Sequence, residues 1–587
     1  MDTIHNLPHQ TFFSRLRKSG EAPHSLFFSS PLRSLSSSEI SALEDAGNFS
    51  PDWDNILVTA SFTATHIRNS CFEGHCFLGS FSSRLDAAEF PPLATGIYNS
   101  TLHDAAVADD CLISSVTLLA GYHVERNSLL LDCGRVTYTV DPNCWLSYDL
   151  IPGNEMGGRE IPILPGITVE DALHACCGEK REAAVQKMLR LREQYLSWIK
   201  ESSGLIGKGS RISGVPLIQD CLIGSGSVLE NCCEVSGSFL ADTIENPASI
   251  TGGAIVRQSV VASGSRVDTQ AVVVRSCLET GCHVERHARV TCSYCGTGCG
   301  IGEGEVSSSL LGPLVAMHHQ SLLIAAIWPD GRGNVGYGAN IGSNHTCRAP
   351  DQEIFIGEGC FFGLSCSVKY PADLSRAPHS VIATAVTLPP GRVEYPLSLI
   401  LEEEGRLTIK PGWLWGGSCY TLLRNQYKYS SKEGIARPLI SCETTWLVSE
   451  ALTYLQNQGK RAAEIRGLGP CILKEKDREM GIRSYKELLR YAVVEHAFLS
   501  ADCASILQEL PDSLLLQGGV DRSDLLEDEK LGYLYRRERD ELLHRARRSR
   551  VRDRTRGELV QGALYLESHP EEDPVLKALQ EELHSQG

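Results

Sequence analysis

The chain has 587 residues, a formal net charge of -17 and only 7% aromatic residues, together with 53 glycines and 22 cysteines. This acidic balance argues against a general nucleic-acid-binding protein, because a polyanion would be repelled. The sequence opens without an apolar run of signal-peptide length, and no stretch approaches the roughly 20 apolar residues of a membrane span. We therefore expect a cytoplasmic protein without a membrane span, whose thiols are reduced and mostly packed inside.

Residues 1–95 lack a clean apolar period and are predicted to be an irregular N-terminal region. Within it, the Ser36 to Glu39 pattern predicts a short capped helix that continues to Glu44 and stops near Gly47. In residues 96–165 the apolar spacing drifts around six, which indicates irregular β coils. In residues 166–203, apolar side chains at helical intervals among charges predict a helical insertion.

Residues 204–400 advance in steps of six. A helix would need apolar spacing near 3.6 and a half-buried strand near 2, so neither explains this period. It is the period of a β-helix, in which each of three flat faces contributes one inward aliphatic side chain and stacked coils form one core. The fold class predicted is mainly β: a left-handed parallel β-helix with an inserted helix and a helical C-terminal region. The apolar triplets spaced by six are Ile206, Ile212 and Ile218; Ile223, Leu229 and Val235; Val261, Val267 and Val273; Leu278, Val284 and Val290; and Ile356, Phe362 and Val368.

The repeat breaks at residues 312–347, and breaks in a solenoid usually extrude loops that carry function. Three histidines fall within these breaks: His318, His319 and His345. Imidazole is well suited to act as a general base near neutral pH, and asparagine amides can hold an oxyanion. The structural alternative is a packed histidine pair with ordinary Gly/Asn turns. One coil spans roughly eighteen residues, so groups on adjacent coils could lie close together.

Residues 401–480 are predicted to be a mixed segment that caps the solenoid, with an aromatic, glycine-rich stretch from Trp413 to Gly417. Residues 481–587 are predicted to be helical. The arginine-rich run from Arg536 to Arg556 contains interleaved acidic residues, which favours a solvated helix that pairs its charges over a nucleic-acid-binding helix.

A CxxC pair, Cys292 and Cys295, is followed by Cys299, and these thiols could hold a zinc ion or an iron–sulfur cluster. No second CxxC lies at a zinc-finger distance, and cysteine fits small inward positions of a coil. We therefore favour packing, and expect no bound metal or cofactor.

On its six-residue repeat the chain resembles the hexapeptide-repeat, left-handed parallel β-helix transferases, over about a third of its length. The resemblance implies a homotrimer, an acyl donor such as coenzyme A or acyl carrier protein, and a histidine base in a cleft between coils. Residues 334–341 and 353–363 are similar to the acetyltransferase half of bifunctional glucosamine-1-phosphate acetyltransferase/uridylyltransferases. The glycine-rich start that marks their nucleotide-transfer domain is absent, which argues against nucleotidyl transfer.

Over its full length the chain is similar to a poorly characterised group of long bacterial β-helix proteins, sometimes labelled pyrophosphorylase-like. Three stretches carry that similarity: residues 154–160, residues 312–325 and the Ser-Asn-His triplet at 343–345.

Together with the breaks in the repeat, the resemblance implies a transferase that moves an acyl group from a thioester donor to a sugar or sugar nucleotide. The alternative is a non-catalytic oligomeric scaffold or a nucleotide-sugar-binding protein. The candidate bases are His318, His319 and His345. The candidate substrate-binding residues are Asn334, Tyr337, Asn340, Ser343, Asn344 and Lys369.

Overall fold

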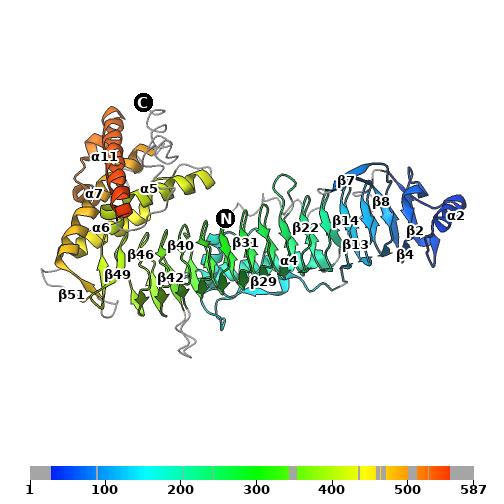
Figure 1. The fold of residues 1–587 in the computed structure, drawn as a ribbon, viewed down its shortest axis with the longest axis horizontal. Coiled ribbons are helices and arrows are strands. Elements are labelled where there is room, and N and C mark those ends of the chain that lie inside the picture. Colours follow the sequence, from blue (N-terminus) through cyan, green and yellow to red (C-terminus); the bar gives the residue numbers. More distant parts are fainter. Residues whose placement is uncertain are drawn as a thin grey trace. The chain divides into compact units, whose positions relative to one another are not determined.

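The structure is a computed structural model. It describes residues 28, 30–87, 90–139, 141–200, 202–241, 243–342, 353–433, 437–457, 463–464, 471–499, 512–525 and 528–555. The chain divides into two compact units: unit 1 comprises Met1–Pro329 and His345–Glu353, and unit 2 comprises Asp330–Asn344 and Ile354–Gly587. Figure 1 shows the elements of both.

Unit 1 is a parallel β-solenoid with three faces, which confirms the predicted mainly β fold. The first face contains β2 (Ile56–Thr59), β5 (Cys76–Leu78), β10 (Ala106–Val107), β13 (Tyr122–Val124), β18 (Gly204–Ile206), β21 (Leu222–Ile223), β24 (Phe239–Leu240), β27 (Val260–Val261), β30 (Cys277–Leu278), β33 (Tyr294–Cys295), β36 (Leu310–Leu311) and β39 (Ala326–Trp328). The second contains β3 (Ile67–Arg68), β8 (Gly96–Tyr98), β11 (Leu112–Ser114), β14 (Leu129–Leu131), β19 (Arg211–Ser213), β22 (Val228–Glu230), β25 (Ser249–Thr251), β28 (Arg266–Val267), β31 (His283–Glu285), β34 (Gly300–Gly302) and β37 (Ala316–Met317). The third contains β4 (Cys71–Glu73), β9 (Thr101–His103), β12 (Leu118–Ala120), β15 (Arg135–Thr137), β20 (Leu217–Gln219), β23 (Glu234–Ser236), β26 (Ile255–Arg257), β29 (Val272–Val274), β32 (Arg289–Thr291), β35 (Glu305–Ser307) and β38 (Leu322–Ile324).

The register of the third face shows how the six-residue period becomes a core. Val256 pairs with Val273, Val273 with Val290 and Val290 with Val306, so each inward valine lies on the valine of the next coil. All four are fully buried, and so are the other aliphatic residues of the predicted triplets in both units. Burial of a valine or leucine side chain contributes about 1.5–3 kcal/mol.

One corner of the solenoid is held by a column of buried serines: Ser238, Ser259, Ser276, Ser293 and Ser309. Each hydroxyl donates to the carbonyl two residues earlier, as Ser276 Oγ does to Val274 O at 2.8 Å. Each hydroxyl also accepts the backbone N–H of the next coil, as Ser276 Oγ does from Ser293 N at 3.2 Å. The residue before each serine has a left-handed backbone, with φ of +48° at Arg275 and +49° at Cys292.

The segment between β15 and β18 leaves the coils and runs along this corner. It contains a short antiparallel pair, β16 (Asp149–Leu150) and β17 (Ile161–Pro162), followed by α3 (Val169–Cys176) and α4 (Arg181–Lys200). We call residues 143–167 the strap. Its amides bind corner carbonyls of three coils: Trp145 N donates to Gly237 O at 2.7 Å, Ile151 N to Cys292 O at 3.3 Å and Gly153 N to Ser308 O at 2.8 Å. On the two coils between the first and second contacts, the Tyr148 side chain accepts from Gln258 at 2.7 Å and lies under the Arg275 guanidinium. The predicted insertion is therefore present, and its helical part is two helices separated after Cys176.

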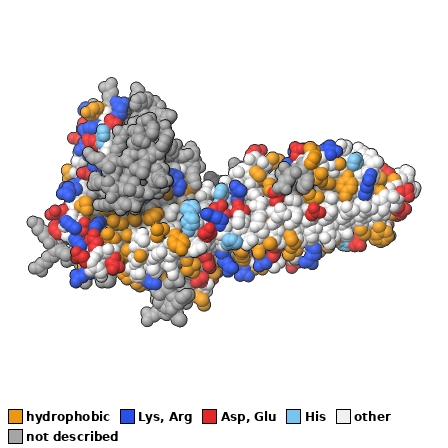
Figure 2. Space-filling model, in the orientation of Figure 1, with side chains coloured by type: hydrophobic (Ala, Val, Ile, Leu, Met, Phe, Trp, Pro, Cys, Tyr) orange, Lys and Arg blue, Asp and Glu red, His pale blue; other side chains and the backbone are white. Residues whose placement is uncertain are grey.

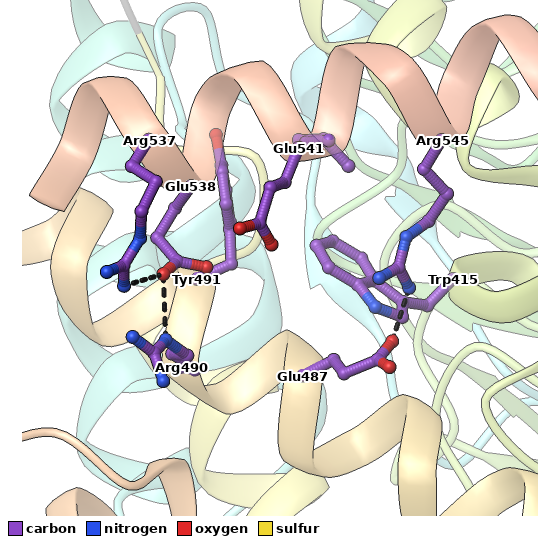
Figure 3. A pocket seen from close by; sticks show the side chains of 9 residues that line it. Trp415, Glu487, Arg490, Tyr491, Arg537, Glu538, Glu541 and Arg545 are labelled. Atoms are coloured by element: carbon purple, nitrogen blue, oxygen red, sulfur yellow. Dashed lines mark hydrogen bonds and ion pairs between the residues drawn. The ribbon is translucent and has the colours of Figure 1, made fainter.

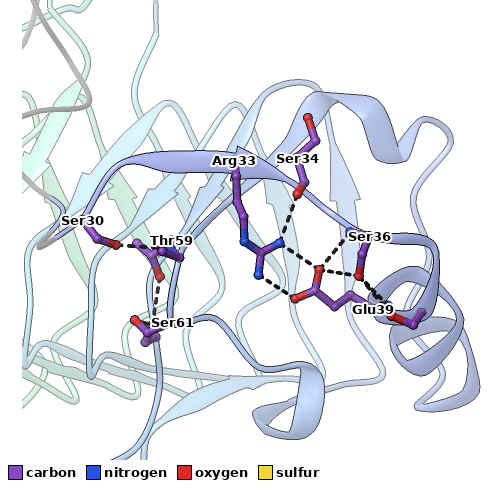
Figure 4. A network of polar contacts seen from close by, with 10 residues as sticks. Ser30, Arg33, Ser34, Ser36, Glu39, Thr59 and Ser61 are labelled. Atoms are coloured by element: carbon purple, nitrogen blue, oxygen red, sulfur yellow. Dashed lines mark hydrogen bonds and ion pairs between the residues drawn. The ribbon is translucent and has the colours of Figure 1, made fainter.

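The N-terminal end of unit 1 carries the predicted capped helix, α2 (Ser37–Asp45). Ser36 caps it: its hydroxyl accepts from Glu39 N at 3.3 Å, and the Glu39 carboxylate accepts from Ser36 N at 2.8 Å. Arg33 also binds that carboxylate, and the pKa of Glu39 falls to about 2, chiefly through the Arg33 hydrogen bond (Figure 4). Arg33 belongs to β1 (Leu32–Ser34), which pairs antiparallel with β2, and nearby β6 (Arg84–Ala87) and β7 (Phe90–Ala94) form an antiparallel pair.

Unit 2 also begins as coils and ends in helices. Its faces contain β42 (Ile354–Ile356), β45 (Ala372–Leu374) and β48 (Gly391–Arg392); β40 (Asn334–Val335), β43 (Phe361–Phe362), β46 (Val381–Ile382) and β49 (Leu399–Glu403); and β41 (Asn340–Ile341), β44 (Ser367–Val368) and β47 (Thr387–Leu388). β50 (Arg406–Lys410) pairs antiparallel with β49, and β52 (Ile472–Leu473) and β51 (Ala463–Glu464) follow at that edge. The helices among its described residues are α5 (Trp413–Glu433), α6 (Cys442–Asn457), α7 (Glu475–Leu499), α9 (Asp512–Gly518), α10 (Arg522–Leu525) and α11 (Asp528–Thr555).

The helices of unit 2 pack on its last coil and on one another. Leu414 N donates to Leu397 O at 2.9 Å, and the Tyr485 hydroxyl donates to Pro396 O at 2.7 Å. α11 lies against α5 and α7. A buried network joins α7 to α11: the Tyr491 hydroxyl donates to Glu495 at 2.8 Å, and Arg539 donates to the Tyr491 oxygen at 2.6 Å.

In the described part of the arginine-rich run, the predicted pairing of charges occurs both with α7 and within α11. Arg545 binds Glu487, while Glu538 accepts from Arg490 and Arg537, each at 2.7 Å (Figure 3). Among the described helices none has an apolar stretch long enough to cross a membrane.

We predict that Ser276→Ala lowers the free energy of unfolding by about 1–3 kcal/mol, because Ser293 N–H and Val274 C=O would lose a buried partner. Denaturant unfolding of the full chain, followed by circular dichroism, measures the change. Ser197→Ala, at an exposed position of α4, is the matched control and should be nearly neutral. Equal stabilities for the two variants would show that the serine column is dispensable.

Candidate functional site

A cavity of about 440 Å³ opens within unit 2, between the coils and α5. Three cationic side chains line it: Arg332, Arg424 and Lys428. None of the described residues at its wall carries a carboxylate. The other lining residues are Gly333, Asn334, Gly359, Cys360, Phe361, Val381, Trp413, Leu414, Ser418, Thr421, Asn425 and Tyr429.

The two walls have different local origins. Strands β40, β43 and β46 supply one wall, with Asn334, Phe361 and Val381 in register on neighbouring coils. α5 supplies the other, where Arg424 and Lys428 are four residues apart and therefore share one side of the helix. The helix is interrupted at Ser418, whose backbone has φ of -144° and ψ of 43°, and Ser418 itself lines the cavity.

Arg332 is the buried cation of the cavity, only 9% exposed. Its Nη1 donates to Asp330 O at 3.0 Å and to Glu358 Oε1 at 3.2 Å, and the Tyr429 hydroxyl donates to its carbonyl oxygen. These contacts fix the guanidinium at the cavity wall and join the coil to α5.

His379 lies behind this wall, next to the same carboxylate, with Nε2 3.9 Å from Glu358 Oε2. Burial lowers its pKa below the ordinary value of 6.5, and Arg332 adds to that effect, whereas Glu358 opposes it. Gly359 separates the histidine from the cavity. A Cβ at Gly359 would lie 2.2 Å from His379 Nδ1, and its φ of +66° also favours glycine.

Another cavity in unit 2, about 360 Å³ between α5, α7 and α11, differs in charge (Figure 3). Its arginines are joined to carboxylates of its own wall: Arg490 and Arg537 to Glu538, and Arg545 to Glu487. On the face of the molecule in Figure 2, both signs of charge are likewise interspersed over the solenoid. A wall with cations and no carboxylate therefore sets the α5 cavity apart from these surfaces.

The family model described as "Domain of unknown function (DUF4954)" matches residues 32–431. The chain belongs to the DUF4954 family. The matched region contains every residue that lines the α5 cavity.

An "Uncharacterized protein" of Treponema pallidum (strain Nichols) is 27% identical to this DUF4954 chain over 436 residues. The alignment covers 72% of the chain and 59% of that relative, so the chain spans well under two thirds of the relative's length. A crystal structure from Desulfovibrio desulfuricans G20, which carries a provisional acetyltransferase name, matches 48% of the chain and 67% of its own, at 11% identity and a TM-score of 0.09.

The structure separates the residues predicted from sequence. In unit 1, His318 and His319 follow β37 and are exposed, with ring centroids 6.5 Å apart. His319 Nδ1 lies 3.7 Å from Glu303 Oε2, and His318 O accepts from Arg286 at 3.4 Å. Ser343, Asn344 and His345 lie outside the described residues.

In unit 2, of the predicted residues only Asn334 is among the described residues that line the cavity. Tyr337 is exposed at the end of its coil, and Lys369 is half-buried after β44. Asn340 lies in β41, and its buried Oδ1 accepts no hydrogen bond from a described residue.

The described histidines and thiols of the sequence motifs do not form a metal site. Within the described residues, no group of three or more His, Cys, Asp or Glu side chains is arranged to hold a metal ion. The buried Cys299 thiol donates to Gly312 O at 3.1 Å, and burial raises the pKa of the Cys295 thiol well above its usual value. These thiols fill the interior of the coils, as the packing interpretation predicts.

We predict that lowering the pH from 7.5 to 5.5 destabilises unit 2 partly through His379. Its pKa is lowered in the folded chain, so below about 6.5 the unfolded chain takes up a proton that the native histidine refuses. Stability from this group is present above that pH and is lost as the pH falls. When thermal unfolding is measured at both pH values, the unfolding temperature should fall less between pH 7.5 and pH 5.5 for His379→Asn than for the unaltered chain. The control is His544→Asn, at an exposed histidine of α11, whose unfolding temperature should fall as much as that of the unaltered chain.

Proposed function

We propose that the chain binds a phosphorylated small molecule in the α5 cavity of unit 2. The observation that carries the proposal is the charge of the wall, which holds Arg332, Arg424 and Lys428 and no described carboxylate in a chain of net charge -17. Arg332 is buried beside Glu358, whereas Arg424 and Lys428 are exposed on α5, so the two α5 cations add positive charge at the cavity that an anionic ligand would meet.

The other lining groups suit a ligand with a polar and a flat part. Asn334, Asn425, Ser418 and Thr421 offer hydrogen bonds to sugar or phosphate oxygens, while Trp413 and Phe361 offer ring faces. The volume of about 440 Å³ lies within the ~300–1,000 Å³ of small-molecule pockets. A nucleotide sugar and the nucleotide end of coenzyme A both combine these features, in line with the ligands expected from the sequence.

A second candidate function is group transfer with His319 as the general base. The observation in its favour is the Glu303 carboxylate 3.7 Å from Nδ1, because a carboxylate at one ring nitrogen orients the imidazole and leaves the other free to accept a proton. In that mechanism Nε2 would take the proton from an acceptor hydroxyl or amine as it attacks a thioester carbonyl, and the thiol would leave. Homotrimer assembly remains part of this prediction.

For the binding function, we predict that the double variant Arg424→Gln, Lys428→Gln weakens binding of coenzyme A or a nucleotide sugar by about tenfold or more. Two charge-assisted contacts to phosphate would be lost, each contributing on the order of 1 kcal/mol at an exposed position. Titration calorimetry measures the dissociation constants of both chains for coenzyme A, acetyl-coenzyme A, a uridine-diphosphate sugar and inorganic pyrophosphate.

The matched control is Lys486→Gln, which removes an exposed cation of α7 away from the cavity and should bind as the unaltered chain does. Failure of all four anions to bind at millimolar concentration would overturn the proposal and favour the scaffold alternative. Binding that survives the double variant unchanged would place the ligand elsewhere.

For the transfer function, His319→Ala and Glu303→Gln should both lower the rate, the first by about a hundredfold or more and the second less, because loss of a general base costs typically 10²–10⁴-fold. The assay follows release of free thiol from acetyl-coenzyme A in the presence of a bound sugar acceptor. His318→Ala is the neighbouring control. A rate that is unchanged in His319→Ala would exclude it as the base.

A further inference from the structure

Two adjacent thiols lie at the C-terminal end of α3, in a setting unlike that of the buried cysteines inside the coils. Cys176 is buried and Cys177 is half-buried, and their Sγ atoms are 3.5 Å apart. Arg159 Nη1 donates to Cys177 Sγ at 3.3 Å. The same guanidinium forms an ion pair with Glu353. Thus a thiol, a guanidinium and a carboxylate meet at one partly exposed point of unit 1.

Arg159 is held there by the loop of residues 154–160, a motif that the α5 cavity does not use. Asn154 Oδ1 accepts from Met156 N at 2.9 Å, and Glu160 accepts from Gly158 N at 2.7 Å. Gly157 and Gly158 have φ of +88° and +103°, a backbone that favours glycine. Arg181, at the start of α4, donates to Gly158 O at 2.9 Å and ties the loop to the helices. The turn thereby presents Arg159 to the thiol.

The hydrogen bonds around Cys177 favour its thiolate. Cys176, whose pKa is strongly raised, keeps its proton and donates it toward Cys177 Sγ, while Arg159 donates from another direction. The pKa of Cys177 falls to about 7, first through the Cys176 hydrogen bond and then through Arg159, although burial and Glu353 oppose the change. By contrast, burial raises the pKa of the inward thiols Cys111 and Cys221 to about 12.

We propose that Cys177 is a reactive thiol of this chain and a site of reversible modification by small disulfides, with Arg159 as its positioning residue. The Cys177 thiolate attacks one sulfur of the disulfide RSSR, a new S–S bond forms, the S–S bond of the reagent breaks, and RS⁻ leaves and takes a proton from water. A small thiol reverses the exchange. No net oxidant beyond the disulfide itself is consumed.

The exchange also changes what Arg159 contacts. A mixed disulfide at Cys177 carries no charge on Sγ, so the guanidinium loses an anionic acceptor and keeps the Glu353 carboxylate as its charged partner. Modification therefore alters the anchoring of Glu353, the residue immediately before β42 in the sequence.

The test exposes the full-length, reduced chain to oxidised glutathione at pH 7 and follows each cysteine by peptide mass mapping. Cys177 should form the mixed disulfide about fivefold or more faster than Cys233, an exposed thiol outside this cluster that serves as internal reference. The pH profile of the rate should have its midpoint below the ordinary thiol value of 9.0, because the pKa of Cys177 is lowered.

Arg159→Gln should move that midpoint upward and slow Cys177 at pH 7 by several-fold, while Cys233 keeps its rate and so reports an intact fold. Arg159→Lys should restore part of the effect, because the positive charge remains. Lys180→Gln, which removes an exposed cation three residues along the chain, should change nothing. The proposal is overturned if Cys177 reacts no faster than Cys233, or if Arg159→Gln leaves the pH midpoint where it was.

Discussion

Most strands of this protein are two or three residues long and are hydrogen-bonded only through the coils on either side. Such short strands have no stability of their own, and a coil cannot bury its own inward side chains. Each coil of unit 1 therefore depends on its neighbours for strand pairing, for the stack of valines and leucines, and for the partners of its corner groups. The serine column meets the last need, because each hydroxyl satisfies a carbonyl of its own coil and an amide of the next.

The repeat could be predicted because every inward position of a coil requires an apolar side chain. A polar side chain at Val273 or Ile218 would be buried without a partner, so the period of six is visible in the sequence itself. The capped helix at Ser36 to Glu39 was equally visible, since both halves of its cap are three residues apart. The serine column was present in the sequence but carried no recognised period, because serine is also common in turns.

The cavity could not be predicted in the same way. Asn334 was identified from its motif, but Arg424 and Lys428 lie far along the chain on a helix whose packing the sequence does not reveal. His379 is the middle residue of an ordinary Pro-His-Ser turn sequence, and only the structure shows that it lies behind Gly359. Conversely, the pair of histidines that stood out in the sequence is exposed on unit 1. Its proposed role depends on the Glu303 carboxylate beside His319, because neither exposed ring is enclosed by the described residues.

Cysteine illustrates how position decides chemistry in this chain. Inside the coils a thiol is a small apolar group that donates to a carbonyl, and desolvation keeps it protonated. At the end of α3 the same side chain has two donors directed at its sulfur. The difference arises from the neighbouring Cys176 thiol and from Arg159, which a glycine-rich turn presents to the sulfur.

The strap has a consequence for how unit 1 comes apart. A simple solenoid behaves as a one-dimensional array in which only neighbouring repeats interact, so an end coil can peel away without disturbing the rest. The strap adds amide contacts to the coils of Gly237, Cys292 and Ser308, and its Tyr148 side chain contacts Gln258 and Arg275 on the two coils between the first two of these. Opening any of these coils must therefore also break a contact with the strap, and we expect this stretch of the solenoid to open cooperatively, with hydrogen exchange of its amides rising together.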